Sequence, residues 1–277
     1  ESRIMESVYG EEISEMLIAL SYQGLIDEVD AIMDVNPNDT HLRLHLQGRD
    51  PDDGMTAIAY DKGYFFLRLL EQTVGREAFD DFLSAYFSKH AFQVMDTDQF
   101  LSYLNENLLT TEALRNEVNV SAWVDGEGLP SNCPEVFSSR IDRVDEMVAN
   151  WTNGTISSSE LPWTDWTYQE KYRFLSNLSD DLDAERLAEL DDTWKINQTG
   201  NNEVLFAWLE QSIRSHHTAS YPRLRTFLVE IGRRKFLTPL YSALIETDQK
   251  DLAASIYGEA RGNYHSVATG TMDALLE

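Results

Sequence analysis

Apolar residues recur every three or four positions over most of the chain, which is the period of an amphipathic helix. Residues 10–33 predict a long helix with four such residues on one face: Ile13, Met16, Leu17 and Leu20. A second helix is predicted within residues 54–75, with three residues directed inward: Phe65, Leu69 and Leu70. Two further helices are predicted within 76–92 and 96–109, the second beginning with a cap at Asp96 and Thr97.

One short segment departs from this period. In "THLRLHLQG", Leu42, Leu44 and Leu46 alternate with polar residues, and this alternation predicts a short strand. His41 and His45 lie four positions apart in the same segment. On a strand that separation is about 13 Å, and no glutamate follows His41, so we predict an exposed strand face here and no metal site.

The pattern breaks at "VDGEGLPSNCPEVF", residues 124–137, which contains two glycines and two prolines. We interpret residues 126–137 as a linker between a domain at 1–125 and a domain at 138–277. A train of short helices is predicted beyond it, at roughly 138–150, 160–178, 182–194, 201–215, 220–231, 234–246 and 248–262. Short helices joined by short loops are typical of an α-solenoid or a helical bundle.

The charge of the chain narrows the choice of partners. There are 48 acidic and 22 basic side chains, for a formal net charge of −26. Such a surface repels phosphate backbones and anionic lipids, so we predict neither nucleic-acid nor membrane binding. Cys133 is the only cysteine, which excludes an internal disulfide and a cysteine-based zinc site and leaves the cellular location undecided.

A basic cluster stands out in so acidic a chain: Arg233, Arg234 and Lys235. Gly232 fits the residue that follows a helix, and cations there relieve the negative pole of the helix. The cluster also opens the next predicted helix, where cations are unfavourable unless they face an anion. Both interpretations stay open from the residues alone.

Several short motifs, taken together, resemble one family. They are Tyr60-Asp61-Lys62-Gly63, Leu70-Glu71-Gln72, "AWVDGEGLP" at 122–130, "NNEVLFAWLEQSI" at 201–213, and Gly232, Arg233, Lys235, Phe236, Pro239 and Leu240. In this order they resemble the aminopeptidase N family of zinc metallopeptidases, in its leukotriene A(4) hydrolase type branch. The resemblance implies a mainly α chain. Residues 1–125 would form the helical C-terminal lobe of a thermolysin-like catalytic domain, and residues 138–277 an armadillo-like α-solenoid.

The resemblance also implies roles for individual residues. Tyr60 would stabilise the oxyanion of the tetrahedral intermediate, a role that suits a neutral phenol donor. Arg233 and Lys235 would bind the carboxylate of a peptide substrate. Asp52 would line the site. A second family tyrosine is Met55 here, which argues against epoxide-hydrolase chemistry and not against peptide hydrolysis.

The family's H-E-x-x-H motif, its glutamate zinc ligand and its amine-binding G-x-M-E-N segment do not occur in the chain. The resemblance implies that they lie upstream of Glu1, and the lack of an initiator methionine agrees with a piece of a longer chain. The first residues are also not a signal peptide. The expected function is therefore the C-terminal part of a zinc aminopeptidase that removes N-terminal residues from peptides. Zinc would bind the full-length enzyme, and this part alone would hold no catalytic zinc and cleave nothing. The alternative is a non-enzymatic, acidic α-solenoid that serves as an interaction module.

Overall fold

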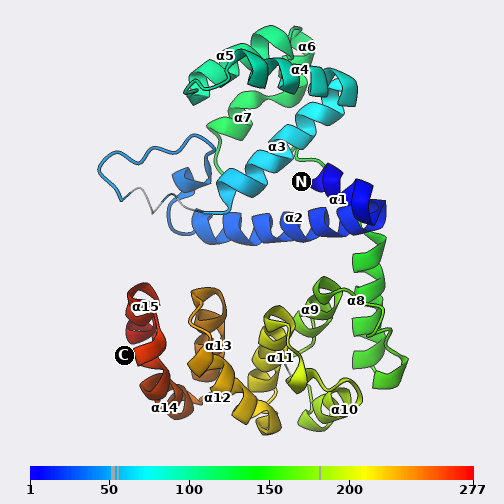
Figure 1. Ribbon diagram of the computed structural model, residues 1–277, viewed down its shortest axis with the longest axis vertical. Coiled ribbons are helices and arrows are strands. Elements are labelled where there is room, and N and C mark those ends of the chain that lie inside the picture. Colours follow the sequence, from blue (N-terminus) through cyan, green and yellow to red (C-terminus); the bar gives the residue numbers. More distant parts are fainter. Residues whose placement is uncertain (51–53, 55, 181) are drawn as a thin grey trace. The chain divides into compact units, whose positions relative to one another are not determined.

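The computed structural model describes residues 1–50, 54, 56–180 and 182–277. The chain forms two compact units, Glu1–Ser138 and Ser139–Glu277. Helices make up both units, and no strand occurs among the residues that the structure describes (Figure 1). The predicted mainly α class is confirmed. None of the described helices is long and apolar enough to cross a membrane.

The first unit contains seven α-helices and a 3₁₀ turn among its described residues. They are α1 (Ser2–Tyr9), α2 (Glu11–Met33), η1 (Pro37–Thr40), α3 (Ile58–Val74), α4 (Arg76–Lys89), α5 (Thr97–Asn107), α6 (Glu112–Val118) and α7 (Val120–Val124). Helix α3 is central, since it packs against α2, α4 and α6. Its residues Phe65, Phe66 and Leu70 are buried, and Phe66 lies against the buried Trp123 of α7.

Two details of the helix predictions can be compared with this unit. Asp96 caps α5 as predicted, because its side chain accepts a hydrogen bond from the Gln99 backbone N–H at 2.8 Å. The buried stripe of α2 differs from the predicted face. Met16 is buried, but the core of the unit is completed by Ile18, Leu25 and Val29. In so long a helix, several apolar stripes fit the sequence, and packing against α3 selects one of them.

The strand predicted from the leucine alternation is wrong. Residues 41–46 are irregular, and Arg43 donates its backbone N–H to the Val124 carbonyl at 3.1 Å. A strand requires a neighbouring ladder of backbone hydrogen bonds. No second strand is present in the described ranges to provide one, so the alternation alone is insufficient.

Residues 126–137 are tied to the first unit. Asn132 accepts a hydrogen bond from the Trp123 indole N–H at 3.0 Å and donates to the carbonyls of Glu117 and Val118 at 2.9 and 3.0 Å. Cys133 is half-buried and packs against the same core. Residues 126–137 therefore pack along the first unit.

The second unit is a stack of helices in two layers. Its α-helices are α8 (Ser139–Thr152), α9 (Tyr168–Ser176), α10 (Ala184–Trp194), α11 (Asn202–Arg214), α12 (Tyr221–Glu230), α13 (Arg234–Glu246), α14 (Lys250–Ala260) and α15 (Ser266–Leu276). Short 3₁₀ turns join them: η3 (Ser158–Glu160), η4 (Ile196–Gln198), η5 (Thr218–Ser220) and η6 (Arg261–Asn263). Helices α9, α11, α13 and α15 pack in succession, and α12 packs against α14 (Figure 1). Large buried side chains fill the space between the layers, including Trp151, Trp208 and Tyr241.

The predicted train of helices is largely confirmed here, with two corrections. The segment predicted as one helix at 160–178 is η3 followed by a loop and α9, because Pro162 interrupts it and Trp163 and Trp166 turn into the core. Helix α15 was not predicted. It buries only Ala268 and Met272 fully, so its apolar periodicity is weak.

We expect the second unit to exchange its backbone amides more slowly than the first. Its buried core is continuous from Val144 to Met272, whereas the core of the first unit is smaller. Slow exchange follows from dense burial, because amides in the core exchange only through large openings. Hydrogen exchange measured by mass spectrometry on the 277-residue chain tests this. Slower exchange in α2 and α3 than in α11 and α13 would contradict it.

Candidate functional site

Tyr60 lies in the first turn of α3, and its side chain is 73% exposed. The Tyr60 backbone N–H donates to the Ala57 carbonyl at 3.0 Å, so the backbone of the turn is fixed. Within the described part of the chain, the Tyr60 hydroxyl makes no hydrogen bond. The phenol is thus held on a regular helix and remains free to donate a hydrogen bond to a ligand.

Lys62 lies two residues further along α3 and anchors this turn. The Lys62 side chain is completely buried. Its ammonium donates to the carbonyl oxygens of Thr40 at 2.8 Å and Gly126 at 2.9 Å. The Thr40 hydroxyl in turn accepts the Gly128 backbone N–H at 2.7 Å. One buried cation therefore joins the start of α3 to η1 and to the loop at 126–128.

Burial has an electrostatic cost for Lys62. Taking an ammonium out of water disfavours its charged form and lowers the pKa of Lys62 to about 8. In the sequence, Lys62 stood out only as part of the Tyr60-Asp61-Lys62-Gly63 motif. The available signal was a lysine placed among the apolar residues of a core helix, where an unpaired cation is unfavourable.

Asp52 and Met55 lie outside the described residues, so the structure does not place these two sequence-predicted positions. His41 and His45 flank the irregular segment in place of the expected strand. The described residues contain no group of three His, Cys, Asp or Glu side chains that could hold a metal ion. The described residues therefore offer no set of ligands for the zinc that the family resemblance implies.

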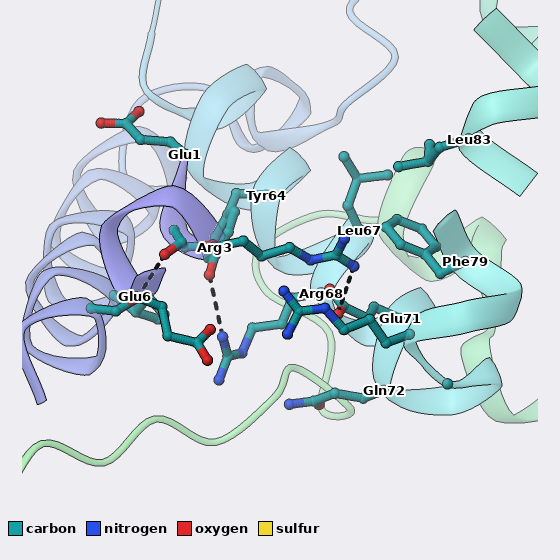
Figure 2. Close-up of a pocket in the computed structure, with 15 residues that line it drawn as sticks. Glu1, Arg3, Glu6, Tyr64, Leu67, Arg68, Glu71, Gln72, Phe79 and Leu83 are labelled. Carbon is teal, nitrogen blue, oxygen red and sulfur yellow. Dashed lines mark hydrogen bonds and ion pairs between the residues drawn. The ribbon is translucent and has the colours of Figure 1, made fainter. Parts of the chain in front are cut away.

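A cavity of about 570 Å³ lies in the first unit, lined by residues of α1, α2, α3 and α4. Figure 2 shows Arg3 reaching from α1 to Glu71 on α3, an ion pair of 2.6 Å, and Arg3 also pairs with Asp80 of α4. Arg68 donates to the Tyr64 hydroxyl at 3.3 Å. Tyr60 does not line this cavity, so the cavity and the predicted catalytic tyrosine are separate features.

The basic segment lies in the second unit, at the start of α13. Arg233 is the N-cap residue, its side chain is exposed, and its guanidinium lies 5.8 Å from the Phe236 ring centre. Among the residues that the structure describes, no carboxylate pairs with Arg233. Lys235 differs, because its ammonium contacts both carboxylate oxygens of Glu203 at 2.7 Å. Glu203 was not predicted from the sequence to belong to this group.

The structure places Arg233 and Lys235 together at the start of α13, in the second unit, and Tyr60 on α3, in the first unit. In each unit, the candidate side chains are hydrogen-bond donors that suit an oxygen acceptor on a ligand. A phenol suits an oxygen that gains charge during a reaction, and a guanidinium suits a carboxylate.

Comparison with known proteins agrees with these features in both units. Residues 1–125 match the model of the peptidase family M1 domain, and residues 166–276 match the model named leukotriene A4 hydrolase, C-terminal. Over these residues the chain resembles the peptidase family M1 domain and the C-terminal region of leukotriene A4 hydrolase. The resemblance stated from the motifs is confirmed.

Individual relatives are fungal. Leucine aminopeptidase 2 of Pyricularia oryzae is 28% identical over 280 residues, covering 96% of this chain and 44% of the relative. Leucine aminopeptidase 2 of Kluyveromyces lactis is 28% identical over 291 residues, with the same coverage of 96% and 44%. The chain thus spans less than half the length of these relatives.

Solved structures show the same fold. A yeast LTA4 hydrolase in complex with bestatin superposes with a TM-score of 0.88 at 24% identity, covering all of this chain and 48% of the other. The native enzyme of Saccharomyces cerevisiae gives a TM-score of 0.82. At this identity the likeness supports the arrangement of helices and carries no residue roles.

Proposed function

We propose that this chain is the C-terminal part of an aminopeptidase that removes N-terminal residues from peptides and that it is inactive alone. The observation that carries the proposal is the exposed phenol of Tyr60, which has no hydrogen bond to any described residue and lies on a helix turn that the buried Lys62 anchors. The match of residues 1–125 to the model of the peptidase family M1 domain supports the reaction class. The H-E-x-x-H motif that the family resemblance assigns to zinc binding does not occur in the sequence, so in this proposal a catalytic zinc would be held by residues outside this chain.

In this proposal, Tyr60 acts on the scissile carbonyl. Its hydroxyl donates a hydrogen bond to the carbonyl oxygen, and the bond strengthens as that oxygen becomes an anion. Since α3 already holds the turn, little reorganisation is needed when charge develops.

Arg233 would bind the other end of a short peptide. A guanidinium presents two parallel N–H donors to a carboxylate, which fixes the orientation of the substrate as well as its affinity. Arg233 is exposed and has no acidic partner in the described ranges, so its guanidinium is available to pair with the carboxylate of a ligand. This contact is made equally in the ground state and in the transition state, and it should therefore affect binding more than turnover.

The test is kinetic and uses the longer protein that includes the zinc-binding half. Arg233→Ala should raise KM for a tripeptide about 10- to 100-fold, the effect of one charge-assisted hydrogen bond, with a smaller change in kcat. An aminoacyl anilide lacks the carboxylate and should be hydrolysed nearly as before. Steady-state kinetics on both substrates measures the difference.

Arg234→Ala is the matched control. Arg234 is also exposed and lies next to Arg233, but it donates to the Thr271 hydroxyl at 3.4 Å. This control should leave both substrates nearly unaffected. If Arg233→Ala and Arg234→Ala behave alike on the tripeptide, Arg233 is not the carboxylate receptor.

A further inference from the structure

Glu203 lies in the first turn of α11, where Asn201 fixes the backbone. The Asn201 side-chain oxygen accepts the backbone N–H groups of Glu203 at 3.0 Å and Val204 at 3.2 Å. A helix N-terminus favours negative charge, so the carboxylate of Glu203 is well placed there. Its side chain is only 26% exposed.

Across from it, Lys235 lies in the first turn of α13, where a cation is unfavourable. Glu203 corrects this, because both of its oxygens accept from the Lys235 ammonium at 2.7 Å. Helices α11 and α13 pack together, so the pair is held by the core as well as by its charges. The ammonium that the family resemblance assigns to the substrate is thus already occupied by an acid of the chain itself.

We infer that Glu203 masks Lys235, so that a substrate carboxylate is received by Arg233 alone, and that Glu203 thereby weakens selection for short peptides with a free C-terminus. This inference rests on the proposed function, since it concerns the same carboxylate-binding segment. Glu203 acts through charge, because it neutralises Lys235 and repels an approaching carboxylate. It is a specificity-determining residue that touches Lys235 and not the reacting atoms.

A first experiment needs no enzymatic activity and uses the 277-residue chain. Lys235 is acylated with an N-hydroxysuccinimide acetate at pH 7.5, and the rate of acylation at Lys235 is followed by peptide mass spectrometry. Glu203→Gln should raise the rate at Lys235 several-fold, because the ammonium loses its ionic partner. The exposed Lys250 is the internal control and should not change. An unchanged rate at Lys235 overturns the inference.

A second experiment measures specificity in the longer protein. Glu203→Gln should lower KM for trialanine about three- to tenfold, which is the effect expected of one unmasked charge near the surface. The KM for the C-terminal amide of trialanine should not change. Adding Lys235→Met to the same protein should return KM for trialanine close to its original value. An unaltered KM in Glu203→Gln overturns the inference.

The two proposals fail in different ways. If Arg233→Ala raises KM for trialanine but Glu203→Gln does not lower it, the carboxylate site stands and the masking by Glu203 is wrong. If neither variant distinguishes trialanine from its amide, the carboxylate site itself is wrong, and the inference about specificity is overturned with it. The labelling rate at Lys235 then reports only whether the ion pair exists.

Discussion

Replacing Tyr60 with phenylalanine in the longer, zinc-complete protein is expected to lower kcat about 10²- to 10³-fold, or ~3–4 kcal/mol of transition-state stabilisation. The variant keeps the aromatic ring at the start of α3 and removes only the donor. Since the hydrogen bond strengthens as the oxygen gains charge, KM should change little. Steady-state kinetics on a tripeptide and on an aminoacyl anilide should show the same loss in both.

Tyr64→Phe is the matched control, because Tyr64 lies one turn further along α3 and its hydroxyl accepts from Arg68 at 3.3 Å. We expect this control to keep nearly all of kcat. If Tyr60→Phe retains more than about a third of kcat on both substrates, against the loss expected for an oxyanion donor, then Tyr60 is a packing residue. The assignment of the site would then fail, whatever the family of the chain.

The second large effect concerns stability. Lys62→Ala should destabilise the first unit by roughly 3–5 kcal/mol, because it leaves a cavity and deprives two carbonyl oxygens of their donor. Lys62→Met fills most of the volume and should cost only about 1–3 kcal/mol, the penalty of the unpaired carbonyls. The difference between the two variants separates the packing of the stem from the hydrogen bonds of the ammonium.

Cys133 provides a reporter for this unit. It packs against the core of the first unit, and burial raises the pKa of its thiol to about 11, so the folded chain should react slowly with thiol reagents. Labelling of Cys133 as a function of urea concentration then follows unfolding of the first unit. Equal midpoints for wild type and Lys62→Ala would show that Lys62 is not an anchor.

The same residue predicts a pH dependence. The pKa of Lys62 is about 8 in the folded chain and near the ordinary value of 10.5 in the unfolded chain. Between these values the unfolded state binds more protons, so the contribution of Lys62 to stability rises with pH. The neutral amine still donates hydrogen bonds, and the cost of burying charge disappears. The stability difference between wild type and Lys62→Met should therefore widen from pH 7.5 to pH 9.5 in urea unfolding monitored by circular dichroism. A constant difference would contradict the assigned pKa.

The fold was predictable wherever a helix has a clear apolar period. Residues 10–33, 54–75 and most of the second unit show that period, and helices formed there. The prediction failed at 41–46, because alternating leucines do not make a strand without a neighbouring strand. It failed at α15 because a helix with few fully buried residues leaves a weak pattern.

The site was predictable only in part, and for a related reason. The motifs name Tyr60 and Arg233, which in the proposed function would act through their own side chains. The hydrogen-bond and ion-pair partners of these segments lie at distant positions in the sequence. Lys62 reaches Thr40 and Gly126, which lie 22 and 64 residues away, and Lys235 meets Glu203, which lies 32 residues away. Spacing along the sequence contains no information on such contacts, and only packing of the helices reveals them.

The central claim is that this chain supplies part of an aminopeptidase site and not a complete one. The direct measurement is hydrolysis of an aminoacyl anilide, with zinc content, for the 277-residue chain and for a longer protein that carries the H-E-x-x-H half. We expect turnover and one zinc per chain in the longer protein, and neither in the 277-residue chain after dialysis against zinc. One tightly held zinc in the shorter chain that disappears in His41→Ala would contradict the account. So would a zinc-loaded longer protein that leaves the anilide intact.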